Sequence, residues 1–447
     1  MQAKPKLGVN GLFLHRFASG IGQVSRFWLE TVADWRQNSG KIESPQVVDK
    51  KATKNETESA DLKLSGIKGI KPERIQPELG NLLRQSEIII YLFQEPSNEL
   101  QEIMQRGRIK WRVAKLPYRR NDLFRQFYWE KFWLPRQAKQ DGCNYFFSLY
   151  QAAGIFSDKI KHLSLVHDVV PKVFPEYLNN WRKKIYYRAV DRAIRKARNI
   201  ITVSNFSRQE IARTYQRPVE EIAVAYIACN PIFQKPVSIT RRKEVLQRYH
   251  LDPNKKYIFN FGGFDYRKNI RGAIEGYAQL LAENFKNNFT AAPDLVLGGT
   301  FHPHLVPLVT NIPEEIKRVS QKYKVPTQKF KLLDPAASTD LPALYQAAEV
   351  FFYPSLYEGF GIPVLEAMWS HTPVVTSGVS SIPEVISAEA GYLINNPRDV
   401  RQIKQKLQEV LFDNPQRRAE KVAKAHREAQ QFSWDKFVAR VSSSLFD

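Results

Sequence analysis

The chain has 447 residues, 43% of them hydrophobic, which suits a soluble protein of two or three domains. Its 67 Lys and Arg residues exceed its 45 Asp and Glu residues, and the net charge of +22 favours an anionic partner: nucleic acid, acidic lipid or a phosphorylated substrate. We find neither an apolar run long enough to span a membrane nor the pattern of a signal peptide. The isolated Cys143 and Cys229 exclude a Cys-rich zinc site. We therefore expect a cytoplasmic protein.

The first half of the chain predicts a parallel α/β sheet. After a strand at residues 7–10 come the loop Ser19-Gly20-Ile21-Gly22 and a helical pattern at residues 21–35. Residues 36–85 are mostly polar, and we expect a disordered or weakly ordered insertion there. Helical stretches then alternate with strands. These strands are expected at residues 88–93, 144–149, 163–167, 199–203 and 222–227.

The second half repeats this alternation after an expected linker at residues 231–253. Its strands are expected at residues 257–261, 294–297, 329–332, 350–353, 373–376 and 391–394, and the tail from residue 414 onward predicts helices. The predicted organisation is therefore a first domain at residues 1–235, a second at residues 250–412, and C-terminal helices at residues 413–447.

The most informative stretch is YPSLYEGFGIPVLEAM at residues 353–368. A buried strand leads into a turn that needs Gly359 and Gly361, and Pro363 then begins a helix. Backbone N–H groups at such a helix start suit a phosphate. Glu358 and Glu366 could accept hydrogen bonds from hydroxyl groups, so phosphate and sugar together indicate a nucleotide sugar. The plainer alternative is a strand–turn–helix connection with two solvated acids.

Three further motifs could contribute to the same site. Gly262 and Gly263 follow a strand, and the neighbouring Arg267 and Lys268 could neutralise a diphosphate, although two surface cations would be the plainer explanation. His167 ends a strand, where a lone histidine is often only structural, and Asp168 suits a cap for the following turn. The glycine loop at residues 19–22 is weak evidence by itself.

Together, YPSLYEGFG, GGFDYRKN, VHDVVPKVF and SGIG resemble the retaining GT-B glycosyltransferases of the glycosyl transferases group 1 family, most closely their mannosyltransferases. The resemblance implies an α/β fold of two Rossmann-like domains facing across a cleft, with the last helix crossing back to the first domain from about residues 432–437. Many members have Arg where this chain has Gly263; here the Arg stands beside the Lys.

The resemblance also implies roles for individual residues. His167 would contact the donor sugar near its reacting carbon, Glu358 the sugar hydroxyls and Glu366 the ribose, while Arg267 and Lys268 would stabilise the departing diphosphate. We therefore expect His167, Arg267, Lys268 and Glu358 to be catalytic. The expected donor-binding residues are Gly20, Gly22, Gly262, Gly263, Gly359, Phe360, Gly361, Leu365 and Glu366.

The expected reaction is metal-independent, retaining transfer of a mannosyl group from GDP-mannose to a glycan or a lipid-phosphate acceptor. A UDP-hexose is the second choice of donor, and no cofactor is expected besides the donor substrate. Two alternatives stay open. One is a nucleotide-sugar epimerase of the same fold, and the other is a basic membrane-binding or nucleic-acid-binding protein with an inactive transferase site.

Two basic segments rich in aromatic residues favour peripheral attachment to the inner face of a membrane. Residues 101–140 carry eleven cations against three anions, and residues 181–198 carry eight against one. Amphipathic helices that bury their aromatic rings would explain the aromatic residues but not the density of Lys and Arg. An anionic lipid surface would explain that density. We expect no nucleic-acid partner, because no recognition motif accompanies the charge.

Overall fold

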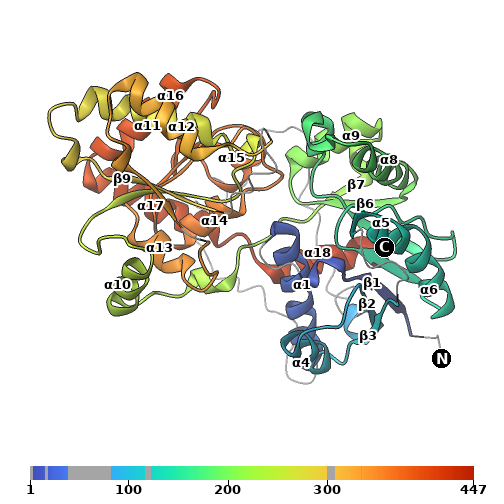
Figure 1. Ribbon diagram of the computed structural model, residues 1–447. Coiled ribbons are helices and arrows are strands. Elements are labelled where there is room, and N and C mark those ends of the chain that lie inside the picture. The colour runs from blue at the N-terminus through green and yellow to red at the C-terminus, as the bar shows by residue number, and fades with distance from the viewer. Residues whose placement is uncertain (1–3, 16–18, 39–81, 116–121, 300–307, 334) are drawn as a thin grey trace, which may run out of the picture.

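The computed structural model describes residues 4–15, 19–38, 82–115, 122–299, 308–333 and 335–447. They form two parallel β-sheets, each with helices packed around it, as the alternating pattern predicted (Figure 1). We call the first sheet with its helices the first lobe, and the second sheet with its helices the second lobe. The predicted two-lobed α/β architecture is confirmed.

The strands follow the predicted order, with ends that differ by at most three residues. The unpredicted strand is β3, which lies within a basic segment and pairs with β2 at the edge of the first sheet. The first sheet contains β1 (Lys6–Asn10), β2 (Glu87–Leu92), β3 (Lys110–Val113), β4 (Tyr145–Ser148), β5 (Lys161–Leu165), β6 (Asn199–Thr202) and β7 (Ile222–Val224). The second contains β8 (Tyr257–Phe261), β9 (Asp294–Gly298), β10 (Phe330–Leu333), β11 (Val350–Tyr353), β12 (Val374–Ser377) and β13 (Tyr392–Ile394).

The helices connect these strands and cover the sheets. Around the first sheet lie α1 (Gly20–Gln37), α4 (Asn98–Arg106), α5 (Asp122–Tyr128), the π-helix η2 (Trp129–Trp133), α6 (Leu134–Gln140), α7 (Val170–Val173), α8 (Trp181–Lys196) and α9 (Asn205–Tyr215). The remaining helices are α10 (Ile239–Arg248), α11 (Ile270–Asn284), α12 (Ile312–Tyr323), α13 (Leu341–Ala347), α14 (Ile362–Trp369), α15 (Ile382–Val385), α16 (Val400–Phe412), α17 (Pro415–Ala429) and α18 (Trp434–Phe446). None of the helices in the described ranges has both the length and the apolar character that crossing a membrane requires.

The strand order places a ligand-binding edge in each lobe. The first sheet has the order β3-β2-β1-β4-β5-β6-β7, and the second has β10-β9-β8-β11-β12-β13. The chain direction around each sheet therefore reverses between β1 and β4 and between β8 and β11. In open α/β sheets, ligands bind beyond the carboxyl ends of the strands at such a reversal. The loops after these four strands carry most of the candidate residues.

The last helix, α18, packs on the first lobe, as predicted (Figure 1). The Trp434 ring stacks on Phe27 of α1 at 5.3 Å between centroids, and its Nε1–H donates to the Cys229 carbonyl at 3.0 Å. At the other end of the helix, Phe446 meets Tyr145 edge to face. These aromatic contacts fix the C-terminal helix on the first lobe.

Two segments are more ordered than predicted. The expected linker at residues 231–253 contains a short 3-10 helix (Pro231–Gln234) and α10, because Arg241 and Arg248 of α10 pair with the fully buried Asp340. The expected insertion at residues 36–85 begins inside α1, where Arg36 donates hydrogen bonds to the carbonyls of Gly107, Leu83 and Ser86. The rest of that insertion, residues 39–81, lies outside the described residues.

Candidate functional site

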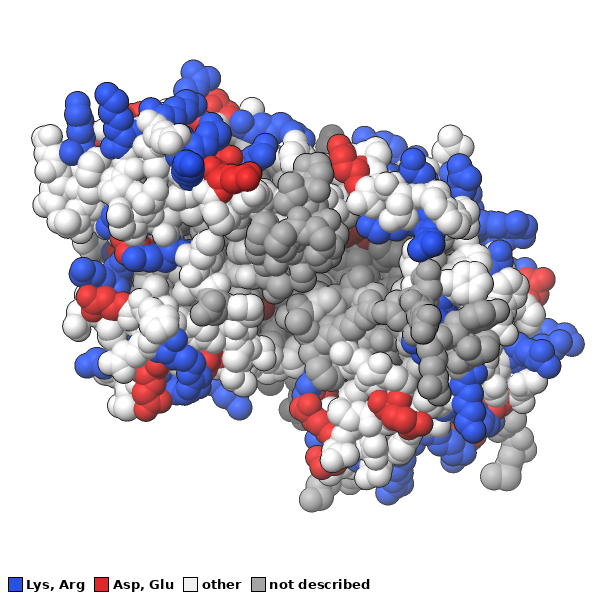
Figure 2. Space-filling model, in the orientation of Figure 1, with Lys and Arg blue, Asp and Glu red and all other residues white. Residues whose placement is uncertain are grey.

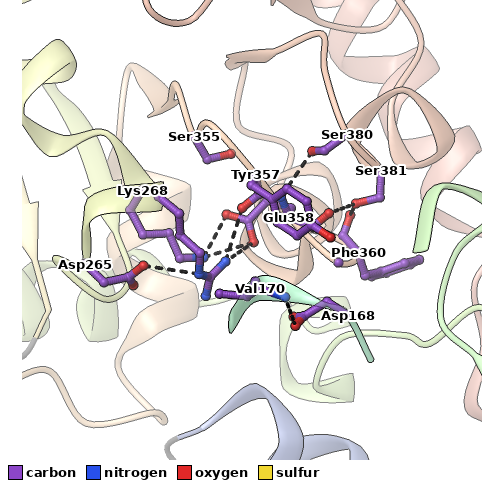
Figure 3. Close-up of polar contacts among 12 residues, drawn as sticks. Asp168, Val170, Asp265, Lys268, Ser355, Tyr357, Glu358, Phe360, Ser380 and Ser381 are labelled. Carbon is purple, nitrogen blue, oxygen red and sulfur yellow. Dashed lines mark hydrogen bonds and ion pairs between the residues drawn. The ribbon is translucent and has the colours of Figure 1, made fainter. Parts of the chain in front are cut away.

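The site is built around the loop that joins β11 to α14. Gly361 has a φ of +115°, which side-chain-bearing residues rarely adopt, and an added Cβ would come 2.6 Å from Ile382. Ser381 holds the loop by donating to the carbonyls of Glu358 and Phe360 at 2.9 and 2.8 Å (Figure 3). The predicted tight turn into a helix is therefore present, and it fixes the backbone on both sides of Gly359.

Glu358 forms ion pairs with both Lys268 and Arg267 in one largely buried charge cluster. Figure 3 shows Glu358 and Lys268 pointing toward each other. Lys268 Nζ lies 2.8 and 3.0 Å from the two carboxylate oxygens of Glu358, and Arg267 Nη1 lies 3.0 Å from one of them. Arg267 Nε also lies 3.1 Å from Asp265, and Lys268 contacts the Tyr353 hydroxyl. Two cations and two carboxylates therefore balance each other within the site.

For Glu358 and for Lys268 alike, burial and the neighbouring charges of opposite sign shift the pKa in opposite directions. Burial alone would raise the pKa of Glu358, but the adjacent Lys268 and Arg267 bring it below the usual value. Burial and the neighbouring Arg267 lower the pKa of Lys268, which Glu358 partly offsets. An arriving diphosphate would place further negative charge beside both cations, and this would favour their charged forms.

Glu366 lies in α14 in a different environment. Its side chain is 3% exposed, and the Tyr345 hydroxyl donates to it at 2.9 Å. Burial raises the pKa of Glu366 to about 8. The carboxyl group is therefore mostly neutral at pH 7, unlike that of Glu358. The neighbouring Leu365 is completely buried.

His167 comes from the first lobe, beyond the end of β5. Its ring Nε2 lies 3.0 Å from the Leu149 carbonyl, and its backbone N–H donates to the Gln151 side chain at 3.2 Å. A carbonyl can only accept, so Nε2 carries the proton and Nδ1 has the free lone pair when the ring is neutral. Burial lowers the pKa of His167, which favours this neutral form. Asp168 accepts from the Val170 N–H at 3.0 Å and so caps the following turn, as predicted.

The two lobes touch at these motifs. A Cβ on Gly359 would come 3.0 Å from the His167 carbonyl, so a side chain there would require the two loops to move apart by a few tenths of an ångström. A Cβ on Gly20 would lie 3.8 Å from Ile362, which places the glycine loop beside the start of α14. Ser19 accepts from the Gly22 N–H at 3.0 Å and caps α1. The structure thus brings together the residues predicted from distant motifs.

Gly262 and Gly263 lie directly beyond β8, in the predicted place. The Gly262 N–H donates to the Gly298 carbonyl at 3.0 Å, and a Cβ on Gly263 would come 3.0 Å from Asp265. These glycines therefore lie in the loop that connects β8 to Arg267 and Lys268. The described residues contain no group of three or more His, Cys, Asp and Glu side chains arranged to hold a metal ion.

Several contact residues were not predicted. Ser204 caps α9 and also donates to the Gly359 carbonyl at 2.7 Å. Glu384 of α15 accepts from the N–H groups of Asn205 and Phe206 at 2.7 and 2.6 Å. The Tyr177 hydroxyl donates to Asp265. These contacts join segments far apart in the sequence, so no local pattern indicated them.

Comparisons with known proteins agree with this geometry. The sequence model described as Glycosyl transferases group 1 matches residues 241–429, and Glycosyltransferase Family 4 matches residues 78–231, so together they match most of the chain. The chain is 34% identical over 269 residues to O-antigen chain mannosyltransferase B of Escherichia coli, covering 60% of this chain and 66% of that protein. It is 28% identical to the serotype-specific mannosyltransferase WbdA of E. coli, covering 61% of this chain and 32% of that protein. The chain thus spans less than two thirds of these relatives' lengths.

Solved structures show the same fold. WaaG, a glycosyltransferase involved in lipopolysaccharide biosynthesis, has a TM-score of 0.64 at 15% identity, with 98% of this chain and 99% of that chain covered. HepE of Anabaena in complex with UDP and glucose has a TM-score of 0.62 at 14% identity, with 98% of each chain covered. The fold is therefore GT-B. The chain belongs to the glycosyl transferases group 1 family of GT-B glycosyltransferases.

Proposed function

We propose that this protein is a retaining, metal-independent mannosyltransferase that moves a mannosyl group from GDP-mannose to a glycan or lipid-linked acceptor. The observation that carries the proposal is the buried cluster of Glu358, Lys268 and Arg267 at the carboxyl ends of β8 and β11, facing His167 of the other lobe. The names of the O-antigen mannosyltransferases that the chain resembles support mannose as the sugar.

In this proposal, Lys268 and Arg267 bind the donor diphosphate and neutralise charge as the sugar–phosphate bond breaks. The acceptor oxygen bonds to the anomeric carbon on the face from which the diphosphate leaves, and the acceptor proton passes to the departing phosphate oxygen. Configuration is thereby retained. Glu358 exchanges its cation partners for donor-sugar hydroxyls, and Nδ1 of His167 accepts from a sugar hydroxyl near the reacting carbon. Glu366 contacts the ribose.

A donor screen tests the proposal. Release of nucleoside diphosphate is measured with GDP-mannose and with UDP-hexoses, with and without a lipid-phosphate acceptor, and NMR of the product gives the anomeric configuration. We expect GDP release that depends on the acceptor, and an α-linked product from the α-linked donor. An epimerase would convert the sugar nucleotide without forming a glycoside. A binding protein with an inactive site would release no diphosphate from any donor.

We further propose that the first lobe binds an anionic membrane surface at the cytoplasmic face. Some aromatic side chains of these segments are buried, such as Trp129 and Tyr187, but Phe124, Phe132 and Trp181 are 49, 51 and 66% exposed, and Ile185 of α8 is 48% exposed. The exposed face of α8 also carries Arg and Lys side chains. Figure 2 shows Lys and Arg at the outer edge of this lobe. Exposed apolar groups among cations suit the boundary of an anionic bilayer.

Vesicle binding tests the membrane proposal. Each basic residue near an anionic bilayer contributes about 1 kcal/mol, so several would give reversible attachment that high salt releases. We expect cosedimentation with anionic but not neutral vesicles, and weaker binding of a Trp181→Ser/Ile185→Ser double variant. Ile239→Ser is the matched control, because Ile239 is 67% exposed but lies on α10. Equal binding to neutral and anionic vesicles would refute the proposal.

A further inference from the structure

Glu130 is a completely buried acid in the first lobe, and the proposed reaction does not use it. It lies in the π-helix η2, between α5 and α6. Its carboxylate accepts hydrogen bonds from the Tyr150 hydroxyl at 2.6 Å, the Ala153 N–H at 2.8 Å, the Gln126 amide at 2.7 Å and the Tyr186 hydroxyl at 3.0 Å. Four separate donors therefore converge on one side chain.

This arrangement suits an ionised carboxylate that acts only as an acceptor. Burial raises the pKa of Glu130, while the hydrogen bonds from Ala153, Tyr150 and Gln126 oppose that effect. None of these four partners is a cation, so only neutral hydrogen-bond donors offset the free-energy cost of burying the charge. π-helical turns are rare and occur often at functional sites. Such a costly group indicates a role beyond filling space.

Two of the four donors lie in the loop after β4. Tyr150 and Ala153 bracket Gln151, whose side chain accepts from the His167 N–H, and Tyr150 follows Leu149, whose carbonyl accepts from His167 Nε2. The loop also packs tightly on the π-helix, because a Cβ on Gly154 would come 2.9 Å from the Glu130 carbonyl. Glu130 therefore fixes the segment that holds His167 at both its ring and its backbone.

We propose that Glu130 is a positioning residue that holds residues 149–153 so that His167 keeps its proton on Nε2 and presents Nδ1 to the donor sugar. The role of His167 rests on the proposed function, but its tautomer does not. Replacing Glu130 by Gln would turn an amide NH₂ toward groups that are themselves donors, such as the Ala153 N–H. The loop would then shift, and the Leu149 carbonyl would no longer fix the ring.

The first experiment follows the His167 imidazole by ¹⁵N NMR in the full-length protein without donor, with the signal assigned by its loss in His167→Ala. In the wild type we expect the Nε2–H tautomer. In Glu130→Gln we expect a mixture of tautomers and an altered titration midpoint. Tyr150→Phe, which removes one hydroxyl donor from the loop, should shift the same signal and serves if Glu130→Gln does not fold. Tyr186→Phe is the matched control, because it removes a hydroxyl donor that lies on α8.

The second experiment is a double-mutant cycle on turnover. Glu130→Gln should lower kcat by about tenfold or more while changing the donor KM only about threefold, because the diphosphate is held by the other lobe. In the His167→Ala background the same substitution should change kcat by less than about twofold. The inference would be overturned if the two substitutions lowered kcat independently, so that their fold-changes multiply in the double variant. An unchanged His167 spectrum in Glu130→Gln would also overturn it. If the wild type shows no transferase activity but the NMR results are as expected, only the proposed function is overturned.

Discussion

Replacing Glu366 by Gln should change how the stability of the protein depends on pH. Burial raises the pKa of Glu366 from 4.5 to about 8 in the folded chain. A group whose pKa is raised on folding stabilises the fold fully below its unfolded pKa, and that stability is lost as pH rises toward the folded pKa. The folded wild type should therefore lose stability between about pH 5 and pH 8 through this residue.

The size of the effect follows from the shift. At about 1.4 kcal/mol per pKa unit, a rise from 4.5 to about 8 removes roughly 3–4 kcal/mol between pH 5 and pH 8. The amide of Gln keeps an oxygen to accept from the Tyr345 hydroxyl but does not ionise. The variant should therefore lack this loss, and its advantage over the wild type should grow steadily with pH.

Thermal unfolding of both proteins at half-unit steps from pH 5 to pH 8 measures the difference. We expect the melting temperature of Glu366→Gln, relative to the wild type, to rise by several degrees over this range, on the order of the 2–4 °C per kcal/mol typical of chains of about 200 residues. Glu283→Gln provides the comparison for removing one acidic group from the surface of the same lobe. Parallel curves for Glu366→Gln and wild type would show that Glu366 ionises normally and would refute the reasoning.

Four further predictions concern the charge cluster and the reaction. Glu358→Ala should destabilise the fold by about 3–5 kcal/mol in thermal melts, because it leaves Lys268 and Arg267 buried without their shared carboxylate; an unchanged melting temperature would contradict the pairing. Lys268→Ala should cost about 2–4 kcal/mol of transition-state stabilisation, roughly 30- to 1,000-fold in kcat/KM. Arg267→Ala should be comparable, and normal turnover of that variant would show that Arg267 does not contact the diphosphate. EDTA should leave turnover unchanged, whereas strong inhibition would contradict a metal-independent reaction.

Much of the fold could be predicted from local patterns. Apolar runs such as those of β8 and β11 are buried on both faces of a parallel sheet, so they stand out from the polar loops between them. β3 could not be found in this way, because it is an edge strand whose residues are alternately exposed and half-buried. The π-helix η2 was not predicted either, and Phe132 within it is exposed.

The candidate site was predicted in its parts but not in its pairing. Gly359, Gly361 and Pro363 identify a turn by their own conformational limits, which are visible in any sequence. That Glu358 pairs with Lys268, 90 residues earlier, follows from the adjacency of β8 and β11, which no local pattern reveals. The pKa values of the two glutamates differ for the same reason: Lys268 and Arg267 lie beside Glu358, whereas Glu366 is buried beside the Tyr345 hydroxyl.

Individually weak contacts join the two lobes beside the candidate site. The Gly359 carbonyl accepts from Ser204 at 2.7 Å, and Glu384 accepts from two N–H groups at the start of α9. Each such hydrogen bond contributes only about 1 kcal/mol net, because water replaces it when the lobes separate. A small apolar cluster that includes Phe174 and Tyr357 adds to them. A donor that has to enter and leave between two lobes needs contacts of this kind, which align His167 with the charge cluster and still open readily.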